Sequence, residues 1–264
     1  MKLFVESAAI LAPGLPGWAI GRAVLAGEKT YQSEPLAPPV ADLLPAVERR
    51  RTGSMVKLAL AVGHQALTSA GRPVDSVATV FVSSGGDGDV INDICITLAG
   101  SDRQVSPTRF HNSVHNAPSG YWGIATHSHH PSTSLCGYNW SFVIGLLEAA
   151  VQLQIDRQEV LLVAYDTPYP EPLGGVRRLA EPFGAALLVT RDRTDRTIAE
   201  LEVNMDARAQ EISRMSDVAL ERLRTGNPCA RALPLLAALA GAQRQQVTLE
   251  RGAGQTLSVC VRTF

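Results

Sequence analysis

The amino-acid sequence predicts an α/β fold in which a mainly parallel sheet is covered by helices. The chain has 264 residues, 45% of them hydrophobic, and a formal net charge of −1, so it can bury a large core and is not a disordered protein. Short runs rich in valine and leucine alternate with longer segments of helical periodicity. The central order is β-α-β-α-β-α-β-β, with links long enough for the crossovers that parallel strands require.

The strands of this sheet are predicted from short apolar runs that are bounded by turn residues. Four such runs are expected to belong to one mixed, largely parallel sheet: Leu3–Ile10, Val77–Val82, Glu159–Tyr165 and Ala185–Thr190. A weaker strand signal covers Ser132–Cys136, and a further strand is expected at Ile198–Val203.

Helices are expected between these strands. Apolar residues at helical spacing predict a helix over Ser54–Ala70, which Gly71 and Pro73 would end. A second helix would start with Asp89 as its N-cap and continue through Leu98.

The third predicted helix, Asn139–Leu153, is apolar on nearly all sides. Its large apolar side chains cannot all face one side of a single core: Trp140, Phe142, Val143, Ile144, Leu146 and Leu147. This pattern predicts an interface with a second subunit through residues such as Phe142 and Leu146. The alternative is that residues 11–45 and 206–243 cover the helix within one chain.

Two stretches, residues 11–45 and 100–131, are rich in Pro, Gly or polar residues and are expected to be irregular, the first with one helical turn. We interpret residues 1–205 as one domain and residues 206–264 as an extension packed on the same core. The extension is expected to hold two helices and two short strands, near Ile212–Arg224, Ala230–Ala240, Val247–Glu250 and Leu257–Val261.

Composition excludes several functional classes. The near-zero net charge removes the electrostatic case for nucleic-acid binding. No apolar stretch approaches the roughly 18 residues of a membrane span, and the apolar run after Met1 is too short for a signal peptide. The four cysteines form no CxxC pair and no metal-ligand pattern. A cytoplasmic protein with reduced thiols and no metal is expected.

A glycine cluster, Gly85, Gly86 and Gly88, lies between a predicted strand and a predicted helix, which is the position of a phosphate-binding turn. The spacing is not G-x-G-x-x-G, and Asp87 and Asp89 would repel a phosphate. A tight turn is therefore favoured, and no cofactor is expected.

Histidine and cysteine give the remaining candidates for chemistry. His111 and His115 would share one face of a helix, but no H-E-x-x-H pattern or nearby carboxylate supports a metal site. Cys136 precedes the third predicted helix, where a thiol can have a lowered pKa and act as a nucleophile. The alternative is a small buried apolar residue.

The order of several segments resembles the amino-terminal half of β-ketoacyl synthases, which have the thiolase-like fold. The matching segments run through the first 205 residues: Arg50–Met55, Lys57–Ala61, Val80–Gly85, Val105–Pro107, Asn112, Asn116–Gly120, Gly145–Ala149, Val160–Ala164 and Glu181–Val189. The resemblance implies one half of a thiolase-like fold, in agreement with the element order above.

The same resemblance implies a departure at the nucleophile, which in this family is a Cys at the start of the third helix. Counting from Pro131 or Ala149 places Asn139 at that position, whereas counting back from Gly145 places Gly137 there. Neither residue can form the acyl thioester that condensation needs. A short gap would restore Cys136.

The family's two catalytic histidines lie in its carboxy-terminal half, and this chain has no histidine after position 130. The resemblance therefore implies a non-catalytic, chain-length-factor-like subunit. It would pair as a heterodimer with a full-length β-ketoacyl synthase and meet acyl carrier protein through that complex, as in aryl polyene biosynthesis. One alternative is an acyl-transferring enzyme that uses Cys136 with His111 or His115 as base. Another is a homodimeric acyl-binding protein.

Overall fold

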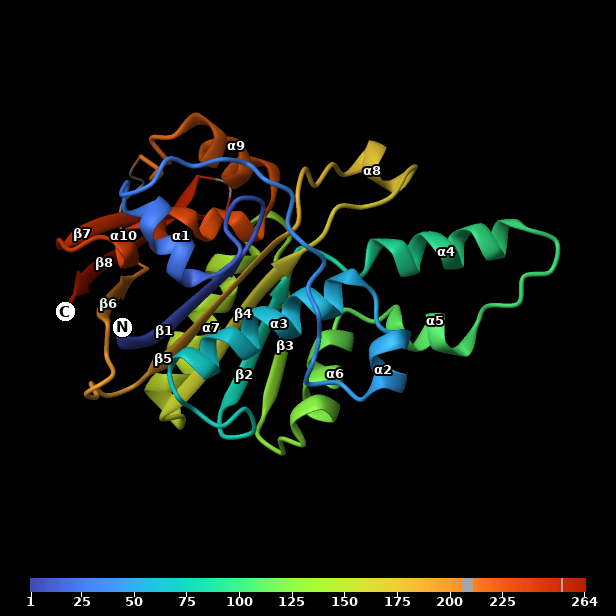
Figure 1. Cartoon of the computed structure of the whole chain (residues 1–264), viewed down its shortest axis with the longest axis horizontal. Coiled ribbons are helices and arrows are strands. Elements are labelled where there is room, and N and C mark those ends of the chain that lie inside the picture. The colour runs from blue at the N-terminus through green and yellow to red at the C-terminus, as the bar shows by residue number, and fades with distance from the viewer. Residues whose placement is uncertain (206–210, 253) are drawn as a thin grey trace.

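One mixed sheet of eight strands organises the chain, and the computed structural model describes residues 1–205, 211–252 and 254–264 (Figure 1). The strands are β1 (Lys2–Leu11), β2 (Ala78–Ser83), β3 (Ser132–Cys136), β4 (Glu159–Asp166), β5 (Phe183–Thr190), β6 (Ala199–Asn204), β7 (Gln245–Gly252) and β8 (Gln255–Thr263). Their order is β3-β2-β4-β5-β1-β6-β8-β7. The four buried runs expected in one sheet are confirmed as β1, β2, β4 and β5.

The helices lie between and beyond these strands. They are α1 (Trp18–Leu25), α2 (Ala46–Arg51), α3 (Ser54–Ser69), α4 (Gly88–Ala99), α5 (Pro107–Asn112), α6 (Ala117–Thr126), α7 (Ser141–Ile155), α8 (Leu173–Val176), α9 (Val218–Gly226) and α10 (Leu233–Ala240), with 3-10 turns η1 (Tyr138–Trp140) and η2 (Cys229–Ala232). No helix in the described ranges is long and apolar enough to cross a membrane.

Strand direction corrects the expectation of a mainly parallel sheet, because the sheet is mixed and most of its neighbouring pairs are antiparallel. Strand β2 is parallel to both β3 and β4, and the remaining neighbouring pairs of the described sheet are antiparallel. Helices α4 to α6 and helix α7 provide the two crossovers that the parallel pairs require. The link from β4 to β5 holds only the short helix α8, so β5 returns antiparallel to its neighbour.

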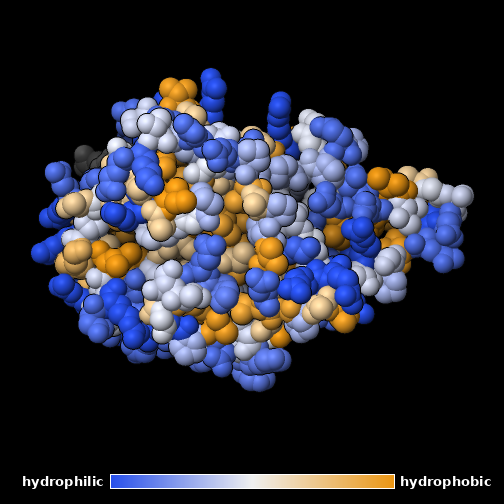
Figure 2. Space-filling view, in the orientation of Figure 1, coloured by the Kyte–Doolittle hydropathy of each residue, from blue (hydrophilic) through white to orange (hydrophobic). Residues whose placement is uncertain are grey.

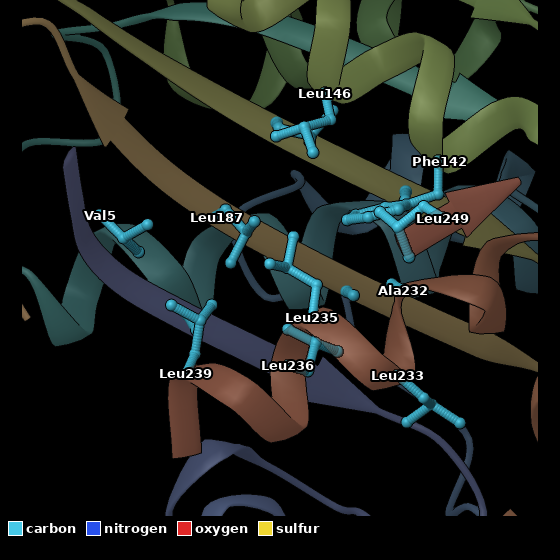
Figure 3. Close-up of a cluster of buried hydrophobic side chains, with 14 of the residues drawn as sticks. Val5, Phe142, Leu146, Leu187, Ala232, Leu233, Leu235, Leu236, Leu239 and Leu249 are labelled. Atoms are coloured by element: carbon cyan, nitrogen blue, oxygen red, sulfur yellow. The ribbon is translucent and has the colours of Figure 1, made fainter. Parts of the chain in front are cut away.

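Two buried clusters cover the two faces of the sheet. Helices α3 and α6 pack on one face, around Trp122 and Phe81, whose ring centroids lie 6.0 Å apart. Helix α7 packs on the other face together with η2 and α10. Figure 3 shows Phe142 and Leu146 of α7 close to Leu235 and Leu249, which come from the C-terminal part of the chain.

This packing corrects the interface predicted for the third helix. Phe142 and Leu146 are 1% and 0% exposed, so neither side chain is available to a second subunit. Helix α7 contacts strands β2 and β4 and also η2 and β7, so its apolar side chains meet several elements of the same chain. The alternative of coverage within one chain therefore holds for these two residues.

Smaller corrections concern the helix boundaries. Helix α4 is capped by Asp87, whose carboxylate accepts from the Val90 N–H at 3.2 Å, and not by Asp89. The stretch expected to be irregular at residues 100–131 contains α5 and α6, and residues 11–45 contain the two-turn helix α1. The helix expected from Ile212 begins only at Val218, after the N-cap Asp217.

Helices α4 and α5 form a part that projects from the sheet (Figure 1). An ion pair of 2.7 Å between Asp93 and Arg109 joins the two helices. Several large apolar side chains are exposed on this part, including Ile96 at 61% and Phe110 at 69%. Apolar surface is visible on the projection in Figure 2.

Candidate functional site

The carboxyl ends of the parallel strands meet at one edge of the sheet, as parallel topology requires. Ser83 ends β2, Cys136 ends β3 and Asp166 ends β4. Ser83 and Cys136 are paired in the ladder, and their Oγ and Sγ atoms lie 3.9 Å apart. The turn η1 and the first residue of α7 follow directly after Cys136.

Asp166 is the buried carboxylate of this edge. Its Oδ1 accepts hydrogen bonds of 2.9 Å from both the backbone N–H and the hydroxyl of Ser84. Its Oδ2 is buried and has no hydrogen-bond partner in the described part of the chain. Burial raises the pKa of the Asp166 carboxyl to about 6, and the hydrogen bonds from Ser84 oppose that rise. The carboxyl therefore titrates close to neutral pH.

Two thiols, those of Cys136 and Cys229, lie near this carboxylate, and the pKa of each is raised. The Cys229 side chain is fully buried, and burial together with the negative charge of Asp166 raises the pKa of its thiol. The Cys136 residue is exposed as a whole, but its partial burial also raises the pKa of the thiol, and Asp166 adds to the rise. A reactive cysteine needs the opposite shift, because the thiolate is the nucleophile.

The start of the third helix is fixed by hydrogen bonds and by an unusual backbone angle. The Ser141 hydroxyl donates to the carbonyl of Ser83 at 2.7 Å and accepts from the N–H of Gly137 at 3.1 Å. Tyr138 has a φ of 53°, in the left-handed region that bulky residues rarely adopt. Asn139, one of the two residues that the resemblance places at the nucleophile position, is half-buried and lines a pocket.

The candidate histidines lie elsewhere. His111 is exposed at the end of α5, and its ring meets that of Tyr121 edge-on at 6.2 Å between centroids. His115 is exposed in the turn before α6. Within the described ranges neither histidine hydrogen-bonds to Cys136, and no group of three or more His, Cys, Asp or Glu residues is placed to hold a metal ion.

Sequence reasoning missed three residues of this edge: Asp166, Arg177 and Cys229. The predicted strand Glu159–Tyr165 stops one residue short of Asp166, and a carboxylate directly after a buried strand is the signal that could have indicated it. Cys229 comes from η2, which reaches this edge only through the fold of the C-terminal segment. Neither Cys136 nor Cys229 has the lowered thiol pKa that favours a nucleophilic cysteine.

Comparison with known proteins identifies the family of this chain. A family model described as "Beta-ketoacyl synthase, N-terminal domain" matches residues 25–252. No curated protein sequence matches the chain.

Solved structures are also similar. A chain of a ketosynthase in complex with its chain length factor from Xenorhabdus doucetiae is 22% identical, with a TM-score of 0.74 over 98% of this chain and 99% of that one. A chain of the ishigamide ketosynthase/chain length factor is 14% identical, with a TM-score of 0.74 over 100% and 99%. At these identities the likeness shows the fold, and the expected thiolase-like fold is confirmed.

Proposed function

Because the chain belongs to the β-ketoacyl synthase family, we propose that it is a non-catalytic, chain-length-factor-like subunit. It pairs with an active β-ketoacyl synthase in polyketide-type chain elongation of the kind that builds aryl polyenes. One observation carries the proposal: counting from Pro131 or Ala149, the residue at the nucleophile position is Asn139. The nearby Cys136 thiol has a raised pKa, and no histidine among the described residues bonds to it. Acyl carrier protein meets the subunit only through the complex.

The edge strand β3 supports the pairing. Strand β3 ends the sheet, so one side of its backbone has no partner strand in the described chain. The Thr79 N–H donates to the Pro131 carbonyl, and in a parallel ladder alternate residues then face β2. The N–H and C=O of Ser134 therefore point away from β2, free to pair with a strand of another subunit.

Apolar surface on helix α7 and on the projecting helices α4 and α5 is consistent with a partner. Ile144 and Leu147 of α7 are only half-buried, and Gln152 of the same helix bonds to Thr133 Oγ1 at 3.1 Å, which places α7 beside β3. The projecting helices α4 and α5 expose further apolar residues. Exposed apolar surface of this kind marks protein interfaces.

The proposal is tested by co-purification from the native host. The tagged chain is expected to recover a full-length β-ketoacyl synthase, and Ser134→Pro is expected to abolish that recovery. Proline removes the outward N–H, yet an edge strand tolerates it where that N–H faces solvent. Ser134→Ala is the matched control, because it also loses the 3.0 Å bond to Ser119 Oγ but keeps the backbone donor.

A strictly monomeric chain that recovers no ketosynthase would remove the subunit proposal. Self-association without a ketosynthase would favour the homodimeric acyl-binding protein instead. Equal recovery by Ser134→Pro and Ser134→Ala would show that the partner does not use the β3 edge. Far-UV circular dichroism of the isolated variants checks that each one folds.

A further inference from the structure

A small pocket beside Asn139 is rich in arginine. Residues of η1, the segment after α8 and the turn between α9 and η2 line a volume of about 230 Å³, among them Tyr138, Asn139, Arg177, Arg178, Thr225 and Arg231. No acidic side chain is among its described lining residues. A cavity that carries one sign of charge attracts ligands of the opposite sign.

The guanidinium of Arg177 lies over the ring of Tyr138 in this pocket. Its central carbon lies 3.4 Å from the centroid of that ring. This cation–π contact restricts the side chain before any ligand arrives, which lowers the entropic cost of binding.

One edge of the Arg177 guanidinium has no partner. Its Nε and Nη2 atoms are buried and form no hydrogen bond within the described residues. The positive charge of Arg177 slightly opposes the rise in the pKa of Asp166, but within the described residues the two side chains form no ion pair. An unpaired buried donor is costly, because it loses its bonds to water without replacement.

Two other arginines of this chain use their Nε and Nη2 atoms to bind a carboxylate. Arg72 donates from Nε and Nη2 to the two oxygens of Glu6 at 3.1 and 2.9 Å. Arg224 donates in the same way to Glu221 at 2.7 and 2.6 Å. Both pairs are bidentate contacts between the guanidinium fork and a planar oxyanion.

We propose that this pocket binds a small oxyanion, a phosphate or carboxylate group, at the guanidinium of Arg177. Arg231 is already paired with Glu250, whereas the exposed Arg178 has no ion-pair partner within the described residues and adds positive charge to the lining. The volume is below the roughly 300–1,000 Å³ of pockets that enclose whole ligands, so the site takes the charged end of a larger molecule. The pocket belongs to this chain alone and does not depend on a ketosynthase partner.

Calorimetric titration of the isolated, full-length chain tests the proposal. Inorganic phosphate and 4′-phosphopantetheine probe phosphate, and acetate and benzoate probe carboxylate, all at constant ionic strength. Arg177→Gln is expected to weaken binding of the preferred anion roughly tenfold or more, and Arg177→Lys several-fold, because lysine keeps the charge but loses the fork. Arg22→Gln, on helix α1 with its charge 3.7 Å from Glu28, is the matched control and should bind as the wild type does.

The ranking of the anions identifies the source of the ligand. Tighter binding of 4′-phosphopantetheine indicates a carrier-borne phosphate, and tighter binding of benzoate indicates a carboxylate-bearing acyl chain. Absence of binding by all four anions would overturn the proposal. Equal affinities of the wild type and both Arg177 variants would overturn it as well. The lysine variant decides the result if the glutamine variant does not fold.

Discussion

Asp166 shows how a single buried carboxyl couples stability to pH. Its pKa is 3.8 in its ordinary state and about 6 in the fold, because burial disfavours the charged form. The difference corresponds to about 3 kcal/mol, since a pKa difference of one is about 1.4 kcal/mol. The folded state holds the proton more tightly than the unfolded state. Stability from this group is therefore complete below pH 4 and is lost as pH rises through 6.

Asp166→Asn is expected to remove this loss, because the amide oxygen can still accept from Ser84 and never ionises. Urea unfolding is measured at pH 4, 5.5 and 7. The free energy of unfolding of the variant, relative to that of the wild type, should increase by about 3 kcal/mol between pH 4 and pH 7. Asp75→Asn, at an exposed position, is the control and should not change the pH dependence. A stability difference between Asp166→Asn and wild type that stays constant with pH would contradict the assignment.

Cys136 provides a second prediction at the residue scale. Its raised pKa leaves little thiolate at neutral pH, so incubation with acyl-CoA or acyl-carrier donors is expected to leave no acyl adduct in the intact mass. Cys136→Ser serves as the matched control. An acyl adduct that forms on the wild type but not on Cys136→Ser would instead support an acyl-transferring enzyme that uses Cys136.

Among the elements, helix α7 was predicted from its local sequence pattern, but the residues that cover it were not. The sequence predicted the helix correctly, yet it assigned Phe142 to an interface because the residues that cover it lie about a hundred positions later in the chain. Helices α5 and α6 were missed because residues 100–131, rich in polar residues and proline, were expected to be irregular. Pro107 and Pro118 are compatible with these helices. Both prolines lie in the first turn of their helices, where proline is favoured.

The burial of Phe142 gives a prediction for this element. Phe142→Ala should lower the free energy of unfolding by about 3–5 kcal/mol, because a large side chain that is 1% exposed leaves a cavity. Ile155→Ala on the same helix removes a side chain that is 71% exposed and should change stability by less than about 0.5 kcal/mol. Urea unfolding followed by circular dichroism compares the two. Similar effects would show that α7 is not buried as described.

The candidate site illustrates the same limit on sequence reasoning. Cys136 was found because it precedes the third predicted helix, and Asn139 because the resemblance placed it at the nucleophile position. Asp166, Arg177 and Cys229 come from three other segments, and only the paired strands and η2 bring them to this edge. Local periodicity carries no information about such long-range proximity.

At the scale of the whole molecule, the C-terminal segment completes the core that the first 205 residues begin. Strand β6 joins β1 to β8, and the N–H of Val203 donates to the carbonyl of Met1 at 2.7 Å. Leu235 and Leu236 of α10 belong to the same buried cluster as Phe142 and Leu146 (Figure 3). The two parts therefore share one apolar interior.

This shared interior predicts a single cooperative unit. The full chain should unfold in one transition, with the same midpoint by near-UV and far-UV circular dichroism. A chain ending at residue 205 lacks η2, α10, β7 and β8, so it exposes the α7 face that these elements cover. It should keep helical signal but lose near-UV signal and bind a hydrophobic dye, as a loosely packed state does. A truncated chain that unfolds cooperatively at the midpoint of the full chain would instead show that the C-terminal segment is dispensable for the core, and that Phe142 is available to a partner after all.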